Sequence, residues 1–257
     1  MNQPLRRFSN VICQYSVVTS TNDIARELAE SGATEGTTVV ATEQTAGRGR
    51  LGRTWVSPKG EGLYHSIILR PNIAALDAPL LNLVIAVALA ETVQQQYQVP
   101  VDIKWPNDVL MRQRKFAGIL TELKTADDRI EYVIAGIGVN LNQTSFPPEI
   151  SNQATSIRLV TGKISHVDEV REKLYFKLDH WYDSFLTNGA QGILDRWCKL
   201  SSYAQDKPVK VVTGDRTMTG RTRGLTPRGE LIVETAAGEL ETILVGDVHN
   251  LTSPSSL

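Results

Sequence analysis

Residues 47–53 read GRGRLGR and follow a strand-like run at 37–44, TTVVATEQ. The loop satisfies G-x-G-x-x-G, the pattern of a dinucleotide-binding loop, which requires a helix to begin at the third glycine. The residues that follow, RTWVSPKG at 53–60, contain a proline and a glycine and are poor helix formers. The next strand-like run ends in Arg70 and Pro71, not in the acidic residue that holds a ribose. The loop therefore argues against a Rossmann fold and indicates a basic loop attached to another kind of sheet.

The predicted elements divide the chain into two parts. Before residue 206, segments with helical spacing or capping signals alternate with β-branched runs. Helices are predicted at 19–31, 78–90, 165–189 and 190–201, and strands at 37–44, 63–70, 101–105, 116–123 and 130–142. A turn is predicted at 111–116, and the last two strands suggest a hairpin joined at 126–128. From about residue 206, short β runs separated by glycine-containing turns predict a small β barrel of roughly fifty residues.

Charge and composition exclude several classes of function. The 257 residues carry a formal net charge of −1, so no overall basic field indicates a nucleic-acid partner. Cys13 and Cys198 form no C-x-x-C pair, which fits a reducing cytoplasm. The four histidines are scattered and form no cluster, so a zinc site built by the protein is not expected.

The most apolar run, APLLNLVIAVALA at 78–90, is too short to span a membrane and contains Asn82. We predict instead a buried core helix started by Asp77 and Pro79. The N-terminal residues MNQPLRRFSN lack the apolar segment of a signal peptide. The chain is accordingly expected in the cytoplasm, with no membrane partner.

Three arginines in the basic loop, Arg48, Arg50 and Arg53, supply permanent positive charge. Guanidinium groups form forked hydrogen bonds that suit phosphate and carboxylate, and the glycines allow the loop to wrap closely around such a ligand. A solvated basic loop is the plain alternative. An RGG-like nucleic-acid segment is a further alternative, weakened by the absence of neighbouring basic and aromatic repeats.

A second unusual stretch, KWPND at 104–108, places Lys104 at a strand end, where it can meet an anion. Asn107 and Asp108 in the following turn can contact Mg²⁺ or a ribose hydroxyl. The alternative is simply a strand, a proline stop and an Asx turn.

Two further features are less distinctive alone. Lys115 lies in the polar, basic segment RQRKFAG, where a lysine of an ordinary turn would also be expected. Gly136 and Gly138 alternate inside a predicted strand, where glycine weakens the strand, and this pattern indicates either close ligand approach or a bulge.

Taken together, these motifs closely resemble the biotin–protein ligases. The matching stretches, in family order, are TSTND (19–23), TEQTAGRGRLGRTW (42–55), KWPNDV (104–109), RKFAGIL (114–120) and GIGVNLN (136–142). The resemblance implies an α+β fold, with a class II aminoacyl-tRNA synthetase/biotin ligase-like mixed sheet and flanking helices. It further implies a catalytic domain at 1–204 and an SH3-like barrel at 205–257. One departure is Leu51, where some relatives carry another arginine.

The resemblance implies a two-step, ATP-dependent reaction. Biotin carboxylate attacks the α-phosphate of ATP, with Mg²⁺ accompanying the nucleotide, and gives biotinyl-5′-AMP and pyrophosphate. A lysine of a biotin carboxyl carrier protein, an acetyl-CoA carboxylase subunit, then takes the biotinyl group and releases AMP. No covalent enzyme intermediate is required.

The resemblance also implies roles for individual residues. The biotin contacts it assigns are Ser20, Thr21, Asn22, Gln44, Arg48, Gly49, Arg50 and Lys115. The nucleotide contacts it assigns are Arg50, Arg53, Trp55, Lys104, Asn107 and Asn140. Catalytic roles fall to Arg50, Lys115 and Asp108, and Asp108 is expected to orient the carrier lysine or help it lose a proton. No metal ligand is assigned.

Several alternatives stay open at this point. A lipoate or octanoate ligase or transferase would share the fold, while a nucleic-acid-binding module or a nicotinamide oxidoreductase belongs to another class. TSTND begins at residue 19, so we expect a ligase without an N-terminal DNA-binding domain. The sequence does not separate a monomer from a homodimer, nor a barrel that closes over ATP from one that docks the carrier.

Overall fold

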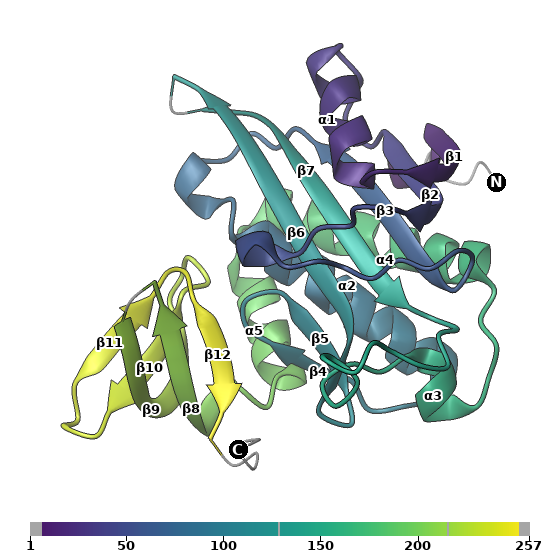
Figure 1. Cartoon of the computed structure of the whole chain (residues 1–257). Helices are drawn as coiled ribbons and strands as arrows, with labels where there is room; N and C mark the ends of the chain where they lie inside the picture. Colours follow the sequence, from purple (N-terminus) through teal and green to yellow (C-terminus); the bar gives the residue numbers. More distant parts are fainter. Residues whose placement is uncertain (1–6, 128, 215, 252–257) are drawn as a thin grey trace.

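The computed structural model describes residues 7–127, 129–214 and 216–251, which form two sheets and five α-helices (Figure 1). The first sheet has seven strands in the order β1-β2-β3-β7-β6-β5-β4. Its strands are β1 (Ile12–Val18), β2 (Thr38–Gln44), β3 (Gly62–Leu69), β4 (Asp102–Lys104), β5 (Asp108–Met111), β6 (Arg114–Ala126) and β7 (Arg129–Asn140). The helices are α1 (Thr21–Glu30), α2 (Leu80–Tyr97), α3 (Ile157–Thr161), α4 (Val167–Asn188) and α5 (Gln191–Leu200). Short 3₁₀ turns are η1 (Arg7–Ser9), η2 (Arg50–Gly52) and η3 (Ala75–Asp77).

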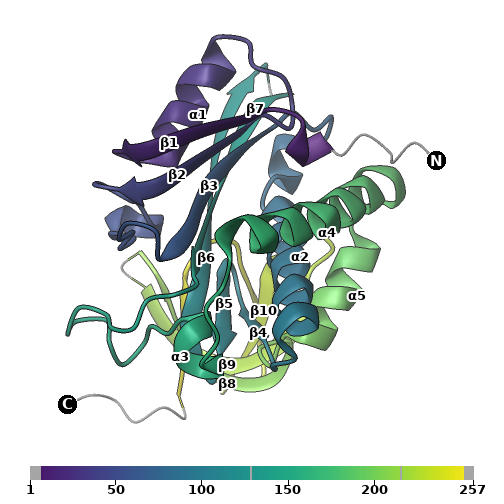
Figure 2. The ribbon, with the colours of Figure 1, turned by 90° about the vertical axis from the view of Figure 1, so that its right-hand side faces the viewer.

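The sheet is mixed, because β1 and β2 run parallel while the other neighbours run antiparallel. Helix α1 lies on one face, and α2, α4 and α5 cover the other (Figure 2). Alternate side chains of β7 point to opposite faces of the large sheet and so contribute to two different cores. Its odd-numbered residues from Val133 to Val139 join the large core beneath α2 and α4. Tyr132 and Ile134 join a smaller core beneath α1, and the next residues on that face are Gly136 and Gly138.

Helix α2 is buried on nearly all sides, which explains why its sequence is apolar throughout. It packs against α4 and α5 on one side and against the sheet on the other. The helical stretch Ala75–Tyr97 is long and apolar enough to cross a membrane by length and composition, but 72% of its apolar window is buried in the protein. The expectation of a core helix is therefore confirmed, although the helix begins at Leu80 and runs seven residues beyond the predicted end at 90.

The second sheet is five-stranded and antiparallel, in the order β11-β10-β9-β8-β12. Its strands are β8 (Gln205–Thr213), β9 (Arg216–Leu225), β10 (Leu231–Thr235), β11 (Leu240–Ile243) and β12 (Asp247–Asn250). This small barrel rests on the large sheet beside β4, where the Trp105 indole Nε1 donates to the carbonyl of Gly229 at 2.9 Å. The apolar residues of both parts join in one core, so the barrel packs directly against the rest of the chain.

Most predicted elements are present, with ends shifted by a few residues. The elements that the sequence patterns did not predict are β1, α3, β12 and the short strand β5 within PNDVLM. The turn predicted at 111–116 is tighter than expected, because only Arg112 and Gln113 take positive φ angles before β6 begins. The turn predicted at 126–128 includes Asp128, and the predicted barrel includes 252–257; these residues lie outside the described ranges.

Candidate functional site

Three glycines on β6 and β7 form the floor of the candidate site. Gly118 and Gly138 are paired in register, and Gly136 lies two residues away on the same face. A Cβ at Gly138 would lie 2.4 Å from Nε1 of Trp55, and a Cβ at Gly136 would lie 2.3 Å from Oδ1 of Asn22. The pairing is regular here, so the glycines do not mark a bulge, and the groups that approach them closely are side chains of the protein, Trp55 and Asn22.

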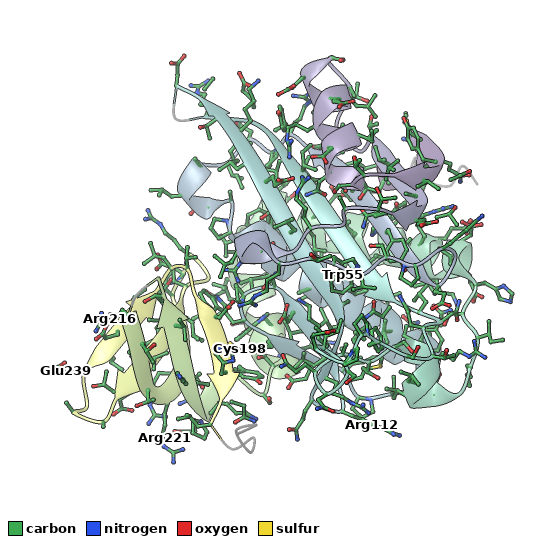
Figure 3. The ribbon with its side chains drawn as sticks, in the orientation of Figure 1. Trp55, Arg112, Cys198, Arg216, Arg221 and Glu239 are labelled. Atoms are coloured by element: carbon green, nitrogen blue, oxygen red, sulfur yellow. The ribbon has the colours of Figure 1, made fainter. Side chains whose placement is uncertain are left out.

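The Trp55 indole covers this floor in front of the central strands (Figure 3). Its Nε1 is buried and has no hydrogen-bond partner among the residues that the structure describes. The ammonium group of Lys115 lies 5.4 Å from the indole ring centre, within range of a cation–π interaction. Trp55 therefore lies over the glycine floor beside Lys115, whose ammonium group itself approaches Gly118.

A network of hydroxyl and amide groups forms one end of the site. Ser20, Thr21 and Asn22 are buried at the start of α1, and Ser20 is its N-cap residue. The backbone amide of Thr21 donates to Oε1 of Gln44 at 2.8 Å, and its hydroxyl lies 3.1 Å from the same oxygen. Ser66 on β3 connects the network, with its hydroxyl 2.7 Å from Oγ1 of Thr21 and 2.6 Å from Oδ1 of Asn22. Four of the residues predicted to contact biotin, namely Ser20, Thr21, Asn22 and Gln44, are thus brought together, and Ser66 joins them without having been predicted from the sequence.

The glycine-rich loop is folded back on itself. Arg48 and Thr54 form an isolated antiparallel bridge, and the backbone amide of Trp55 donates to the carbonyl of Gly47 at 2.8 Å. A Cβ at Gly47 would lie 2.4 Å from the carbonyl oxygen of Trp55, so this position requires glycine. At the tip, Leu51 takes a φ of 55° and is two-thirds exposed.

Arg48 points to acidic groups at the polar end of the site. Its guanidinium lies 2.7 Å from both carboxylate oxygens of Asp23 and 3.3 Å from Oε1 of Glu122. Burial opposes its charge, but the hydrogen bond to Asp23 and the charge of Glu122 outweigh burial, so the pKa of Arg48 is raised. Asp23 lies within TSTND and Glu122 within the strand predicted at 116–123, but the sequence pattern assigns a functional role to neither of them.

Arg50 and Arg53 point in the other direction, toward the barrel. Arg50 donates to Oδ1 of Asn107 at 3.2 Å and to the carbonyl of Gly246 at 3.4 Å. Arg53 forms an ion pair with Asp247 at the start of β12. Burial is the main cause that lowers the pKa of Arg50. The barrel therefore supplies two residues beside the site, Gly246 and Asp247, for which the sequence offered no signal.

The two predicted lysines share one carboxylate. The ammonium of Lys115 lies 2.6 Å from Oδ1 of Asp108, and that of Lys104 lies 3.9 Å from its Oδ2. The pKa of Lys104 is lowered, chiefly by burial and also by the neighbouring positive charge of Lys115, against the attraction of Asp108. The KWPND turn and the RKFAG segment thus meet in space as a compact group of charges.

Asn140 is placed differently from the other predicted nucleotide residues. Its amide nitrogen donates to the carbonyl of Thr155 at 3.1 Å, and its amide oxygen accepts from Gln143 at 3.2 Å. The backbone amide of Thr155 in turn donates to the carbonyl of Lys115 at 2.8 Å. Asn140 is therefore connected to Lys115 through the segment at 153–155, and both ends of its side chain are already bonded within the protein.

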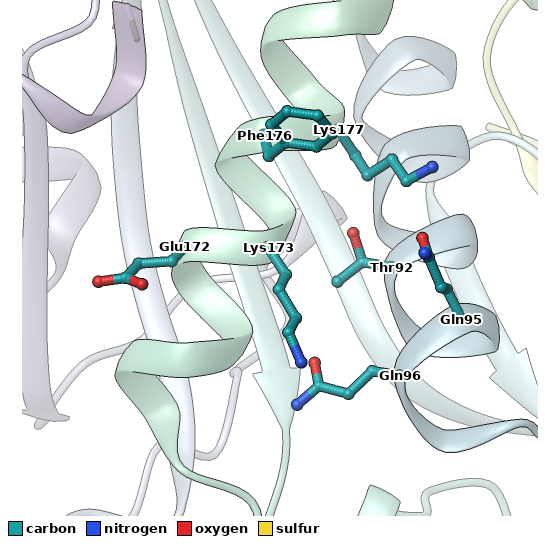
Figure 4. A pocket seen from close by; sticks show the side chains of 7 residues that line it. All are labelled: Thr92, Gln95, Gln96, Glu172, Lys173, Phe176 and Lys177. Atoms are coloured by element: carbon teal, nitrogen blue, oxygen red, sulfur yellow. The ribbon is translucent and has the colours of Figure 1, made fainter. Parts of the chain in front are cut away.

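Within the described ranges, no three His, Cys, Asp or Glu side chains form a metal-binding group. A cavity of about 590 Å³ does occur between α2 and α4, on the sheet face opposite α1 (Figure 4). Its lining residues are Thr92, Gln95, Gln96, Glu172, Lys173, Phe176 and Lys177. None of them belongs to the predicted site, so this cavity does not bear on the chemistry proposed for the glycine floor.

A glycine floor on a mixed sheet, with cationic groups at one end and hydroxyl and amide groups at the other, suits a ligand that has an anionic end and a polar end. Residues 15–140 match the model of the biotin/lipoate A/B protein ligase family, and residues 206–249 match the biotin protein ligase C-terminal domain. The chain belongs to this family of ligases.

Individual relatives support the same assignment. The bifunctional ligase/repressor BirA of Bacillus spizizenii is 39% identical over 237 residues, covering 91% of this chain and 72% of the relative. The biotin–[acetyl-CoA-carboxylase] ligase of Paracoccus denitrificans is 34% identical, covering 85% of this chain and 92% of the relative. The biotin protein ligase from Aquifex aeolicus, solved in complex with biotin and ATP, superimposes with a TM-score of 0.80 at 31% identity, covering 93% and 98% of the two chains.

Proposed function

We propose that this chain is an ATP-dependent biotin–protein ligase. It converts biotin and ATP to biotinyl-5′-AMP and pyrophosphate, and then transfers the biotinyl group to one lysine of a biotin carboxyl carrier protein. The observation that carries this proposal is the meeting of Lys115, Lys104 and Asp108 beside a glycine floor, with the hydroxyl and amide network at its other end. A ligand with a polar head, an apolar middle and a reactive carboxylate fits this order of groups, and biotin is such a ligand.

At the polar end, Ser20, Thr21, Asn22 and Gln44 bind the ureido ring of biotin. Hydroxyl and amide groups can both donate and accept, and the ureido ring offers two N–H donors and one carbonyl acceptor. Arg48 and Gly49 close this end from the loop, and Arg48 acts through its ion pairs with Asp23 and Glu122.

At the charged end, the site must bring together a carboxylate and a polyphosphate that repel each other. Fixed cations in a partly water-excluded site reduce this repulsion and stabilise the charge that develops on the α-phosphate in the transition state. Lys115 contacts the reacting carboxylate and α-phosphate, and Arg50 spans the biotinyl-adenylate junction. Nucleotide contacts are assigned to Arg53, Trp55, Lys104, Asn107 and Asn140, with Asn140 acting through the segment behind Lys115.

Mg²⁺ enters with ATP as part of the substrate. This ion prefers phosphate oxygens and water to a cage built by protein side chains, so the phosphates themselves supply much of its coordination. It supplies positive charge on the phosphates as the carboxylate attacks.

Transfer to the carrier begins once pyrophosphate has left. The carrier lysine must lose a proton before its amine attacks the acyl carbon, and AMP departs with the electrons of the broken acyl–phosphate bond. Asp108 is bonded to Lys115 in the structure. When the adenylate engages Lys115, that carboxylate becomes available to accept a hydrogen bond from the carrier lysine and to take its proton.

We assign this chemistry to a catalytic domain at 1–204 and place an SH3-like barrel at 205–257, where Gly246 and Asp247 hold the loop arginines. The reaction suits the cytoplasm, where ATP and biotin-dependent carboxylases occur together. Lipoate or octanoate transfer is the same-fold alternative, and a dependence of adenylation on biotin distinguishes the two.

The experiment that tests this function is biotin-dependent exchange of labelled pyrophosphate into ATP, with Mg²⁺, for the parent and Lys115→Ala. We expect exchange that requires biotin and falls by more than about a hundredfold in the variant, because the charge that meets the α-phosphate is lost. Exchange that occurs with lipoate but not with biotin would show that lipoate is the substrate. Absence of exchange with both acids would refute the ligase function. Lys173→Ala, in the distant cavity between α2 and α4, is the matched control and should leave exchange unchanged.

A further inference from the structure

Glu122 on β6 stands at the junction of three segments that form the polar end of the site. One carboxylate oxygen accepts from the amide nitrogen of Asn22 at 2.7 Å. The carboxylate also accepts from Arg48 of the glycine-rich loop at 3.3 Å and from Arg26 of α1 at 3.0 Å. Asp23 pairs with the same two arginines, so two positive and two negative charges balance in this group. In the proposed function Glu122 serves only as an ion-pair partner of Arg48.

The carboxylate fixes which way the Asn22 amide faces. A carboxylate can only accept hydrogen bonds, so the amide nitrogen of Asn22 must face Glu122 and its oxygen must face Ser66. The carbonyl of Leu120, at 3.4 Å from the same nitrogen, favours the same orientation more weakly. The absence of a Cβ at Gly136 leaves the space that the amide oxygen occupies in this orientation.

This orientation leaves the hydroxyl network one proton short. Three close oxygen contacts run from Asn22 to Ser66, from Ser66 to Thr21 and from Thr21 to Gln44. The two hydroxyls carry two protons, while the amide oxygens of Asn22 and Gln44 can only accept. The two shortest contacts, at 2.6 Å and 2.7 Å, have the length of O–H···O hydrogen bonds, so each holds a proton. Because the amide oxygen of Asn22 can only accept, Ser66 donates to Asn22 and Thr21 donates to Ser66. The contact between Thr21 and Gln44, at 3.1 Å, is then the one without a hydroxyl proton.

The reversed amide would remove this shortage. If the nitrogen of Asn22 faced Ser66, it would donate to Ser66, Ser66 to Thr21 and Thr21 to Gln44, and every contact would hold a proton. Only the acceptors on the other side of Asn22, of which Glu122 is the charged and closer one, oppose that arrangement. Oε1 of Gln44 already accepts the backbone N–H of Thr21 at 2.8 Å, and Oγ1 of Thr21 receives no proton within the network. Glu122 therefore leaves both oxygens able to accept a further N–H from a ligand.

We propose that Glu122 is a positioning residue that sets the donor–acceptor polarity of the biotin pocket, so that the pocket accepts a ureido N–H at Thr21 and Gln44. This inference rests on the proposed function, because it takes biotin as the ligand. Glu122 acts through Asn22, and its pairs with Arg48 and Arg26 hold the carboxylate in the required place.

The test combines two variants with two ligands. Glu122→Ala removes the acceptor, and Glu122→Gln keeps the side-chain volume while losing the charge. The ligands are biotin and the cyclic carbamate analogue in which ring oxygen replaces one ureido N–H. The measurements are the KM values for the acid and for ATP in pyrophosphate exchange, with thermal unfolding as the check on folding. Glu131→Ala is the matched control, since Glu131 is a glutamate of the neighbouring strand whose carboxylate pairs with the exposed Lys124 at 3.3 Å.

For Glu122→Ala we expect the KM for biotin to rise about tenfold, as for the loss of a hydrogen bond that involves a charged group, with the KM for ATP unchanged. The preference for biotin over the carbamate should shrink by a similar factor, and Glu122→Gln should show the same trend to a smaller degree. Glu131→Ala should match the parent in both.

Two results would overturn the proposal. One is an unchanged preference for biotin over the carbamate in both variants, which would reduce Glu122 to a structural residue. The other is an equal rise of both KM values, which would show general loosening of the loop. If Glu122→Ala does not fold, Glu122→Gln carries the same comparison. A parent protein without biotin-dependent exchange would instead refute the proposed function, so the two failures are distinguishable.

Discussion

The glycine floor can be tested with a single methyl group in Gly138→Ala. The new Cβ would lie 2.4 Å from Nε1 and 2.5 Å from Cε2 of Trp55, whereas ordinary van der Waals contact begins at 3.4 Å. The indole must therefore withdraw by about 1 Å, and displacement of that size at the reacting groups costs on the order of a hundredfold in rate. The φ angle of Gly138 is not positive, and alanine is favoured over glycine within a strand by roughly 0.5–1 kcal/mol, so the variant should stay folded.

The assay is biotin-dependent pyrophosphate exchange, together with urea unfolding. We expect Gly138→Ala to lose about a hundredfold in exchange while its free energy of unfolding does not fall. Gly192→Ala on α5, where an added Cβ meets nothing within 4 Å, is the control and should keep full activity. Full exchange by Gly138→Ala at parental KM values would refute the reasoning, because it would show that the position of Trp55 over the floor is irrelevant to adenylation.

Other predictions address stability and product retention. Burial, followed by the charge of Arg171, lowers the pKa of His65 to about 3, so the unfolded chain binds a proton below pH 6.5 that the folded protein excludes. Acid should therefore destabilise the fold by about 2 kcal/mol at pH 5 relative to pH 7, and urea unfolding of His65→Gln should show a smaller loss. Trp105→Phe leaves the buried carbonyl of Gly229 without its 2.9 Å bond and should cost about 1–3 kcal/mol of unfolding free energy, contradicted by an unchanged urea midpoint. Arg50→Gly removes the bonds to Asn107 and to the barrel, and it should release labelled biotinyl-adenylate faster than the parent in a chase experiment; equal rates would exclude this role.

Local pattern was sufficient to predict much of the fold. Helices α1, α2, α4 and α5 have capping signals or apolar residues at helical spacing, and most strands are β-branched runs. Strand β1 was not predicted, because it lies at the sheet edge. Four consecutive side chains are exposed there, so buried and exposed residues do not alternate along it. Strand β5 was not predicted, because its four residues follow closely after a proline and resemble a turn. Only its pairing with β4 and β6 defines it as a strand.

The sequence by itself determined which residue types are available to the site. The local patterns are the three arginines among three glycines, the KWPND turn and the two alternating glycines on one strand. They indicate an anion-binding pocket in which other groups can approach the backbone closely. The tertiary structure decided how those groups are paired. Arg48 lies against Glu122, 74 residues away, and Arg50 against Gly246, 196 residues away. Such pairings follow from the register of the central strands and from the packing of the barrel, and no short-range pattern encodes them.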